Sequence, residues 1–137
     1  MSEPTRDGRC LCGAVRYQAP WPPKALMVCH CRNCQKQSGS ALSVVAMVAR
    51  DELALVGEMA MFEDESDAGQ PVFRYFCAAC GSPLVTDTPS AREGGITFIK
   101  AGTLDETSDL EPTVHLWTCR AQKWVVIPEG VTRLEEQ

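Results

Sequence analysis

The sequence has no dense run of lysine and arginine and no long apolar segment. Its 13 Lys and Arg residues are outnumbered by 18 Asp and Glu residues, for a formal net charge of -5. Nucleic-acid binding needs a concentrated basic face, so we expect no nucleic-acid partner. No stretch approaches the roughly 18 apolar residues of a membrane span, and the opening MSEPTRDGRC has no apolar core before a cleavage site. We therefore expect a cytoplasmic protein with no membrane partner.

The composition is that of a folded protein. Hydrophobic residues make up 45% of the chain and charged residues 23%, so the low hydrophobicity typical of disorder is absent. The 137 residues suit one domain, 1–137, which can bury a core without disulfide staples. We place that core at about 8–125. The remainder, 126–137, is a tail whose last residues we expect to fray.

Strand-forming residues dominate the chain. Seven stretches are rich in β-branched and aromatic residues and end at Gly, Pro or acidic turns: 15–19, 41–49, 53–56, 72–76, 83–87, 96–102 and 113–119. One short polar segment, 31–39, has helical character and can end at Gly39. We interpret 63–71, with its acidic run, and 88–95 as solvated loops. The pattern predicts a mainly β fold.

Seven of the eight cysteines fall into three groups: CLCG (10–13), CHCRNC (29–34) and CAACG (77–81). Only Cys119 stands apart, and we expect it to be a free thiol. In a reducing compartment thiols are seldom held as structural disulfides, so metal binding is the favoured interpretation. Zinc takes four ligands in tetrahedral geometry, and tight CxxC turns bring two sulfur atoms onto one ion. Gly13 and Gly81 each follow a cysteine pair and suit a turn with positive φ.

Ligand counting divides the seven cysteines into two sites. The first and third groups supply two sulfur atoms each and complete a closed, structural zinc site: Cys10, Cys12, Cys77 and Cys80. The central group supplies three, the number expected when a fourth position is kept for water or substrate: Cys29, Cys31 and Cys34. Spacing does not enforce this division. Two central cysteines can instead join the first pair, which would leave CAACG as a redox pair.

The two histidines are further candidate ligands. In an extended chain His30 faces away from Cys29 and Cys31, so we expect it to pack or to support the site indirectly. His115 could approach from a distant strand and close the three-sulfur site, although a hydrogen-bonded, partly buried imidazole is the commoner role.

The ordered motifs CLCG, CHCRNCQKQSG, FCAACGSPL, IKAGTLD and PTVHLWTCRAQKW resemble the glutathione-dependent formaldehyde-activating enzyme (GFA) family. The centromere protein V domain belongs to the same group. The likeness runs from about Gly8 to Trp124. It implies a β-tent of small antiparallel sheets with zinc knuckles and one or two short helical turns.

The resemblance also implies two zinc ions per chain. The positions that match the family's structural zinc ligands are Cys10, Cys12, Cys77 and Cys80, and those that match its catalytic zinc ligands are Cys29, Cys31 and Cys34. The family's reaction joins formaldehyde to the glutathione thiol to give S-hydroxymethylglutathione, and its reverse cleaves a carbon-sulfur bond. We therefore expect a zinc-dependent carbon-sulfur lyase with a small thiol such as glutathione as partner. A non-catalytic zinc scaffold that binds a protein is the alternative.

Several side chains outside the cysteine groups are candidates for contact with a substrate. A substrate carboxylate could meet one of four cations: Arg32, Lys36, Arg120 and Lys123. Trp117 and Trp124 could line an apolar pocket. For each of these residues a surface or packing role is the commoner alternative.

Overall fold

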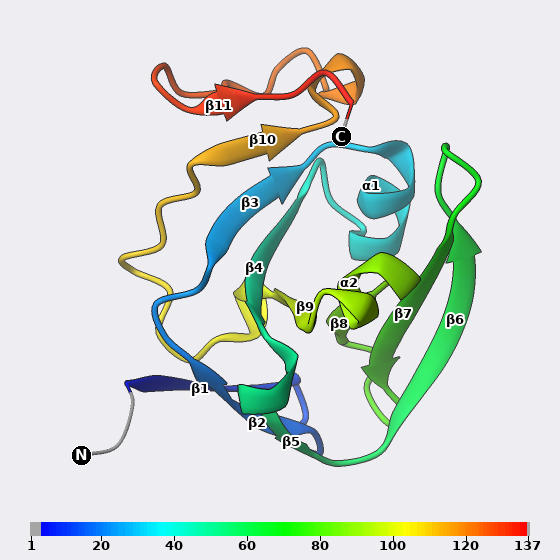
Figure 1. Ribbon diagram of the computed structural model, residues 1–137, viewed down its shortest axis with the longest axis vertical. Helices are drawn as coiled ribbons and strands as arrows, with labels where there is room; N and C mark the ends of the chain where they lie inside the picture. The colour runs from blue at the N-terminus through cyan, green and yellow to red at the C-terminus, as the bar shows by residue number, and fades with distance from the viewer. Residues whose placement is uncertain (1–3, 137) are drawn as a thin grey trace.

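The computed structural model describes residues 4–136, and its fold is mainly β (Figure 1). The strands are β1 (Thr5–Arg9), β2 (Arg16–Pro20), β3 (Ala25–Cys29), β4 (Ser43–Ala49), β5 (Ala54–Val56), β6 (Met59–Glu65), β7 (Pro71–Cys77), β8 (Pro83–Asp87), β9 (Ile96–Lys100), β10 (Val114–Leu116) and β11 (Thr132–Arg133). The helices are α1 (Arg32–Ser38) and α2 (Pro89–Glu93), with three short 3-10 turns at Arg50–Glu52, Ala101–Thr103 and Thr118–Arg120. None of the helices within 4–136 is long and apolar enough to cross a membrane.

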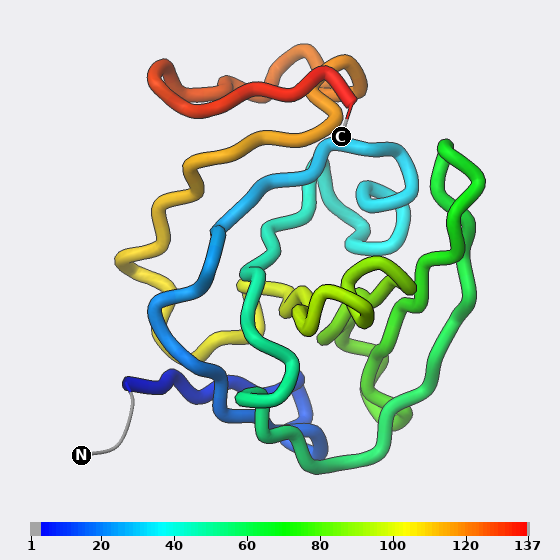
Figure 2. The backbone as a smooth tube through the Cα atoms, viewed as in Figure 1, coloured from blue at the N-terminus to red at the C-terminus, as the bar shows by residue number. Residues whose placement is uncertain are grey.

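The strands form two sheets. The larger has the order β11-β10-β3-β4-β9-β8-β7-β6, and the smaller has the order β1-β2-β5. β1 and β11 lie at opposite ends of the molecule (Figure 2). Most pairings are antiparallel, as expected, but β10 runs parallel to both β3 and β11. The larger sheet curves, so that β3 and β4 lie on one side of the molecule and β7 and β6 on the other, with α1 between them (Figure 1).

The core lies where the two sheets meet. Its most deeply buried side chains come from the larger sheet and from the segment between β1 and β2: Cys10, Val15, Val48, Cys77, Leu84 and Ile99. Tyr17 of β2 adds a polar link, because its hydroxyl bonds to Thr103 Oγ1 at 2.7 Å. Burial of these apolar groups, at roughly 25 cal/mol per Å², is the main favourable term that holds the sheets together.

Three sequence predictions of local structure are corrected. Residues 63–65 extend β6 instead of belonging to a loop, because an edge strand tolerates acidic side chains on its open faces. Segment 89–93 is a helix, started by Pro89 and by Thr88, whose hydroxyl accepts a hydrogen bond from the Ala91 amide at 3.0 Å. The tail does not fray over 132–136, because β10 offers a free edge: Leu134 N–H donates to the His115 carbonyl at 2.9 Å.

Burial in the core predicts how much a truncated side chain destabilises the protein. Leu84→Ala should lower the free energy of unfolding by about 2–5 kcal/mol, because its fully buried side chain leaves a cavity. Val126→Ala is the control, since Val126 is 87% exposed and should lose less than about 0.5 kcal/mol. Urea denaturation of both variants measures the difference. A loss of similar size in the two would mean that Leu84 is not part of the packed core.

Candidate functional site

Four cysteines from two distant parts of the chain meet at one point. Cys10 and Cys12 follow β1, Cys77 ends β7, and Cys80 lies in the turn to β8. Their four sulfur atoms lie within 4.8 Å of one another. Two of the distances are 3.6 Å, from Cys10 to Cys12, and 3.8 Å, from Cys12 to Cys77. A tetrahedral ion with bonds of about 2.3 Å separates its sulfur ligands by about 3.8 Å, so this set fits a metal such as zinc.

Backbone geometry around this cluster favours sulfur in its anionic form. The Val15 amide donates to Cys10 Sγ at 3.3 Å, and the Cys80 amide donates to Cys77 Sγ at 3.4 Å. Hydrogen bonding with Ser82 lowers the pKa of Cys80. Gly13 and Gly81 both have φ of 81°, which confirms the predicted turns of positive φ. The hydrogen bonds favour the thiolates of Cys10 and Cys80, whereas at Cys12 the Ala14 amide lowers the pKa but contact with Cys10 and burial raise it to about 11.

Three further cysteines meet at the end of β3 and the start of α1. Cys29 ends β3, Cys31 is the N-cap residue of α1, and Cys34 lies in its first turn. Their sulfur atoms also lie within 4.8 Å of one another. The Cys34 amide donates to Cys31 Sγ at 3.2 Å, so a sulfur replaces the usual capping oxygen. Within the described chain no His, Asp or Glu atom lies within 4.8 Å of all three sulfur atoms.

The three sulfur atoms are too close to ionise independently. Hydrogen bonds from Cys29 and Cys31 lower the pKa of Cys34, and the positive charges of Lys100 and Arg74 assist. The same contacts, Cys31 first and then Cys34, raise the pKa of Cys29. One thiolate is thus stabilised by its neighbours' protons. A divalent cation can take the place of those protons, which is the chemistry of a metal-thiolate site.

The two histidines bind each other. His30 Nε2 and His115 Nδ1 are 2.9 Å apart, and their rings stack with centroids 5.2 Å apart. Both side chains are buried, and neither belongs to a cysteine cluster. His115 therefore does not close the three-sulfur site. The pair packs β10 against β3 behind the cysteines, which matches the packing role expected for His30.

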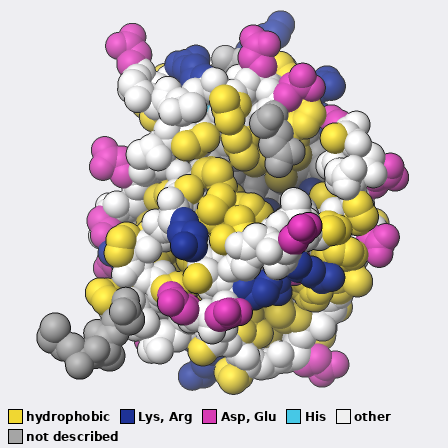
Figure 3. Space-filling model, in the orientation of Figure 1, with side chains coloured by type: hydrophobic (Ala, Val, Ile, Leu, Met, Phe, Trp, Pro, Cys, Tyr) yellow, Lys and Arg dark blue, Asp and Glu magenta, His cyan; other side chains and the backbone are white. Residues whose placement is uncertain are grey.

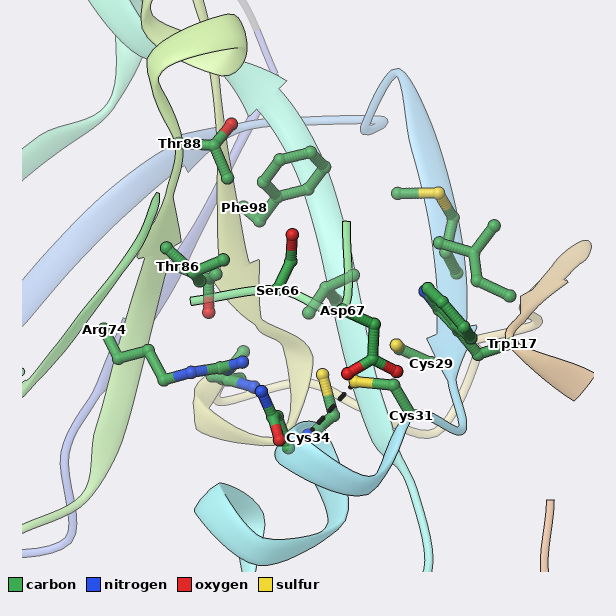
Figure 4. Close-up of a pocket in the computed structure, with 16 residues that line it drawn as sticks. Cys29, Cys31, Cys34, Ser66, Asp67, Arg74, Thr86, Thr88, Phe98 and Trp117 are labelled. Carbon is green, nitrogen blue, oxygen red and sulfur yellow. Dashed lines mark hydrogen bonds between the residues drawn. The ribbon is translucent and has the colours of Figure 1, made fainter. Parts of the chain in front are cut away.

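The three-sulfur cluster lies in a pocket of about 130 Å³ between β3, β4, β8 and β9 (Figure 4). Its walls are largely apolar and include Met27, Val45 and Phe98. Trp117 lines it too, whereas Trp124 is 72% exposed and lies elsewhere. Hydrophobic side chains also gather over the middle of the face seen in Figure 3, and most acidic side chains lie toward its edge.

The cations that line the pocket are not those that the sequence singled out. None of the four predicted cations lines it: Arg32, Lys36, Arg120 and Lys123. Arg74 and Lys100 do, and both are buried, at 5% and 6% exposure. Arg74 reaches from β7 toward the cysteines (Figure 4). The sequence did hold a signal for both residues. Arg74 in VFRYF and Lys100 in ITFIK are each the lone basic residue of an apolar stretch, which indicates a charged side chain that the strand can bury.

The remaining cysteine lies outside both clusters. Cys119 is exposed in the turn Thr118–Arg120. No described cysteine forms a disulfide bond. Two groups of cysteine side chains can thus hold metal ions, one with four sulfur ligands and one with three.

Comparisons with known proteins identify the family. A family model described as "Glutathione-dependent formaldehyde-activating enzyme" matches residues 5–120. A Halomonas elongata protein named "Putative glutathione-dependent formaldehyde-activating enzyme" is 30% identical over an alignment of 127 residues that covers 88% of this chain and 80% of that protein. A Podospora anserina protein of the same name is 33% identical over an alignment of 87 residues that covers 61% of this chain and 39% of that protein.

A solved structure shares the fold. The crystal structure of a Rhodobacter sphaeroides protein aligns with a TM-score of 0.58 at 17% identity, covering 75% of this chain and 91% of that one. At this identity the likeness concerns the fold alone. The family model, which spans most of the chain, and the Halomonas relative agree on the assignment. The chain belongs to the glutathione-dependent formaldehyde-activating enzyme family.

Proposed function

We propose that the protein is a zinc-dependent carbon-sulfur lyase that acts on a thiol adduct such as S-hydroxymethylglutathione. Cys10, Cys12, Cys77 and Cys80 hold a structural zinc ion in this proposal, and Cys29, Cys31 and Cys34 hold a catalytic one. The observation that carries it is the contrast between the clusters. Four sulfur atoms close the first, whereas the second has three and opens into a pocket. Three protein ligands with one open position are typical of catalytic zinc.

The chemistry requires a thiolate and an electrophilic carbon in contact. A zinc ion held by the three cysteines would bind the substrate's sulfur in the fourth position and favour its deprotonation. In the forward direction the thiolate sulfur forms a bond to the carbonyl carbon of formaldehyde. The C=O π electrons move to the oxygen, which takes up a proton. The reverse removes that proton and breaks the carbon-sulfur bond, so atoms and charge balance in both directions.

The pocket's size and lining support this assignment. A volume of about 130 Å³ is smaller than the roughly 300 Å³ at which sites for whole drug-sized ligands begin. It admits the thiol-bearing end of a substrate and a one-carbon aldehyde, while the rest of a tripeptide extends outside. Apolar walls from Met27, Val45 and Phe98 exclude water from the adduct.

The two clusters should respond differently to the same substitution. Zinc analysis should find two ions per chain in the wild type. Cys10→Ser should prevent stable folding, because that metal's binding energy contributes to folding. Cys34→Ser should leave the protein folded with one ion, and Cys119→Ser, the matched control, should keep both. Metal analysis with circular dichroism measures these outcomes. Equal destabilisation by Cys10→Ser and Cys34→Ser would contradict separate roles.

Glutathione should enter the open position. In cobalt-substituted protein it should change the sulfur-to-cobalt charge-transfer and ligand-field absorption at millimolar concentration, because a fourth thiolate replaces a solvent ligand. S-methylglutathione, which has no free thiol, is the control and should leave the spectrum unchanged. A spectrum that does not respond to glutathione would favour the non-catalytic scaffold.

A further inference from the structure

Lys100 is a buried cation without a carboxylate partner. It lies at the end of β9, is 6% exposed, and lines the same pocket as the three cysteines. Its ammonium donates to Ser43 Oγ at 2.7 Å, a neutral acceptor. Within residues 4–136 it forms no ion pair. An ammonium group in such a site is costly unless a negative charge lies close by.

The carboxylates near the pocket do not supply that partner. Asp64 is already paired with Arg74, whose Nε donates to it at 2.9 Å. Asp67 lines the pocket but is exposed. Burial lowers the pKa of Lys100. The negative charge of Cys34 opposes this effect most strongly, because it favours the charged ammonium. Of the anionic groups that share the pocket with Lys100, the half-buried sulfur cluster is less screened by water than the exposed Asp67, so its charge is the one that Lys100 faces.

The charge of the cluster depends on what enters the fourth position. Three thiolates and one divalent cation carry a single net negative charge, which a neutral ligand leaves unchanged. A thiolate ligand makes it doubly negative inside a largely apolar pocket. Water cannot screen that additional charge well there, so a fixed positive charge beside the cluster should matter most for an anionic ligand.

We propose that Lys100 stabilises the thiolate form of the ligand in the open position and thereby sets the site's preference for thiols over neutral ligands. The proposal rests on the proposed function, because it takes the three cysteines to hold a metal ion with an exchangeable ligand. Lys100 is then a specificity-determining residue, because its positive charge stabilises the negative charge on the ligand sulfur. It deepens the proposed function by defining the ligand class as anionic sulfur.

The test compares an anionic and a neutral ligand of the same metal. Cobalt-substituted wild type and Lys100→Met are titrated at one pH with 2-mercaptoethanol, which binds as a thiolate, and with imidazole, which binds uncharged. An opposite charge within a few ångströms changes an ionisation by 1–3 pKa units, so Lys100→Met should weaken the thiol at least about 10-fold. Imidazole affinity should change less than about 2-fold.

Two variants serve as controls. Lys24→Met removes the same charge from an exposed position and should alter neither affinity. Ser43→Ala removes the hydrogen-bond acceptor of Lys100 but keeps its charge, so the thiol preference should persist. If Lys100→Met does not fold, Lys100→Gln provides the same loss of charge with a polar side chain.

The outcomes separate this inference from the proposed function. Unchanged thiol affinity in the folded Lys100 variant, or equal weakening of both ligands, would overturn the role of Lys100 while leaving thiol binding intact. A wild type that binds imidazole but no thiol would overturn the proposed function itself, and this inference with it.

Discussion

Close approach of cysteine sulfur atoms constrains both the junction of the two sheets and the pocket. Neighbouring thiolates repel, so each cluster needs shared protons or a metal ion to keep its sulfur atoms within 4.8 Å of one another. The four-sulfur cluster joins the end of β1, in the smaller sheet, to the β7-β8 turn of the larger one. Cys10 and Cys77 are also fully buried core residues. Metal binding and sheet packing thus stabilise the same junction.

The three-sulfur cluster depends on a short helix that could not persist alone. α1 has seven residues, well below the length at which isolated helices are stable. Gln35 anchors it: the buried amide donates to the His30 carbonyl at 2.7 Å and to the Arg120 carbonyl at 3.1 Å. Behind the cysteines, the His30 and His115 pair packs β3 against β10. These contacts hold the three sulfur atoms at the pocket that Lys100 and Arg74 also line.

Sequence reasoning succeeded where the signal was local and failed where it depended on packing. The strand 83–87 and the helix ended by Gly39 were predicted because residue type and a left-handed cap decide them. Counting the ligands likewise indicated the two groups of cysteines that the structure brings together. The helix after Thr88 was not predicted, although Thr88 followed by Pro89 is a typical helix start. Arg74 and Lys100 were overlooked because a lone basic residue in an apolar strand is a weaker signal than cations beside the cysteine motifs, and only the fold shows which cations line the pocket.

The proposed function requires one metal ion closed by four cysteines and a second ion with three cysteines and an exchangeable fourth ligand. X-ray absorption at the zinc edge of fully reduced, zinc-replete protein tests it most directly, because it counts sulfur and lighter ligands. The expected result is seven sulfur ligands shared between two ions, with a single oxygen ligand that glutathione replaces by sulfur. A nitrogen ligand that persists in glutathione, or only one bound ion with four sulfur ligands, would contradict it.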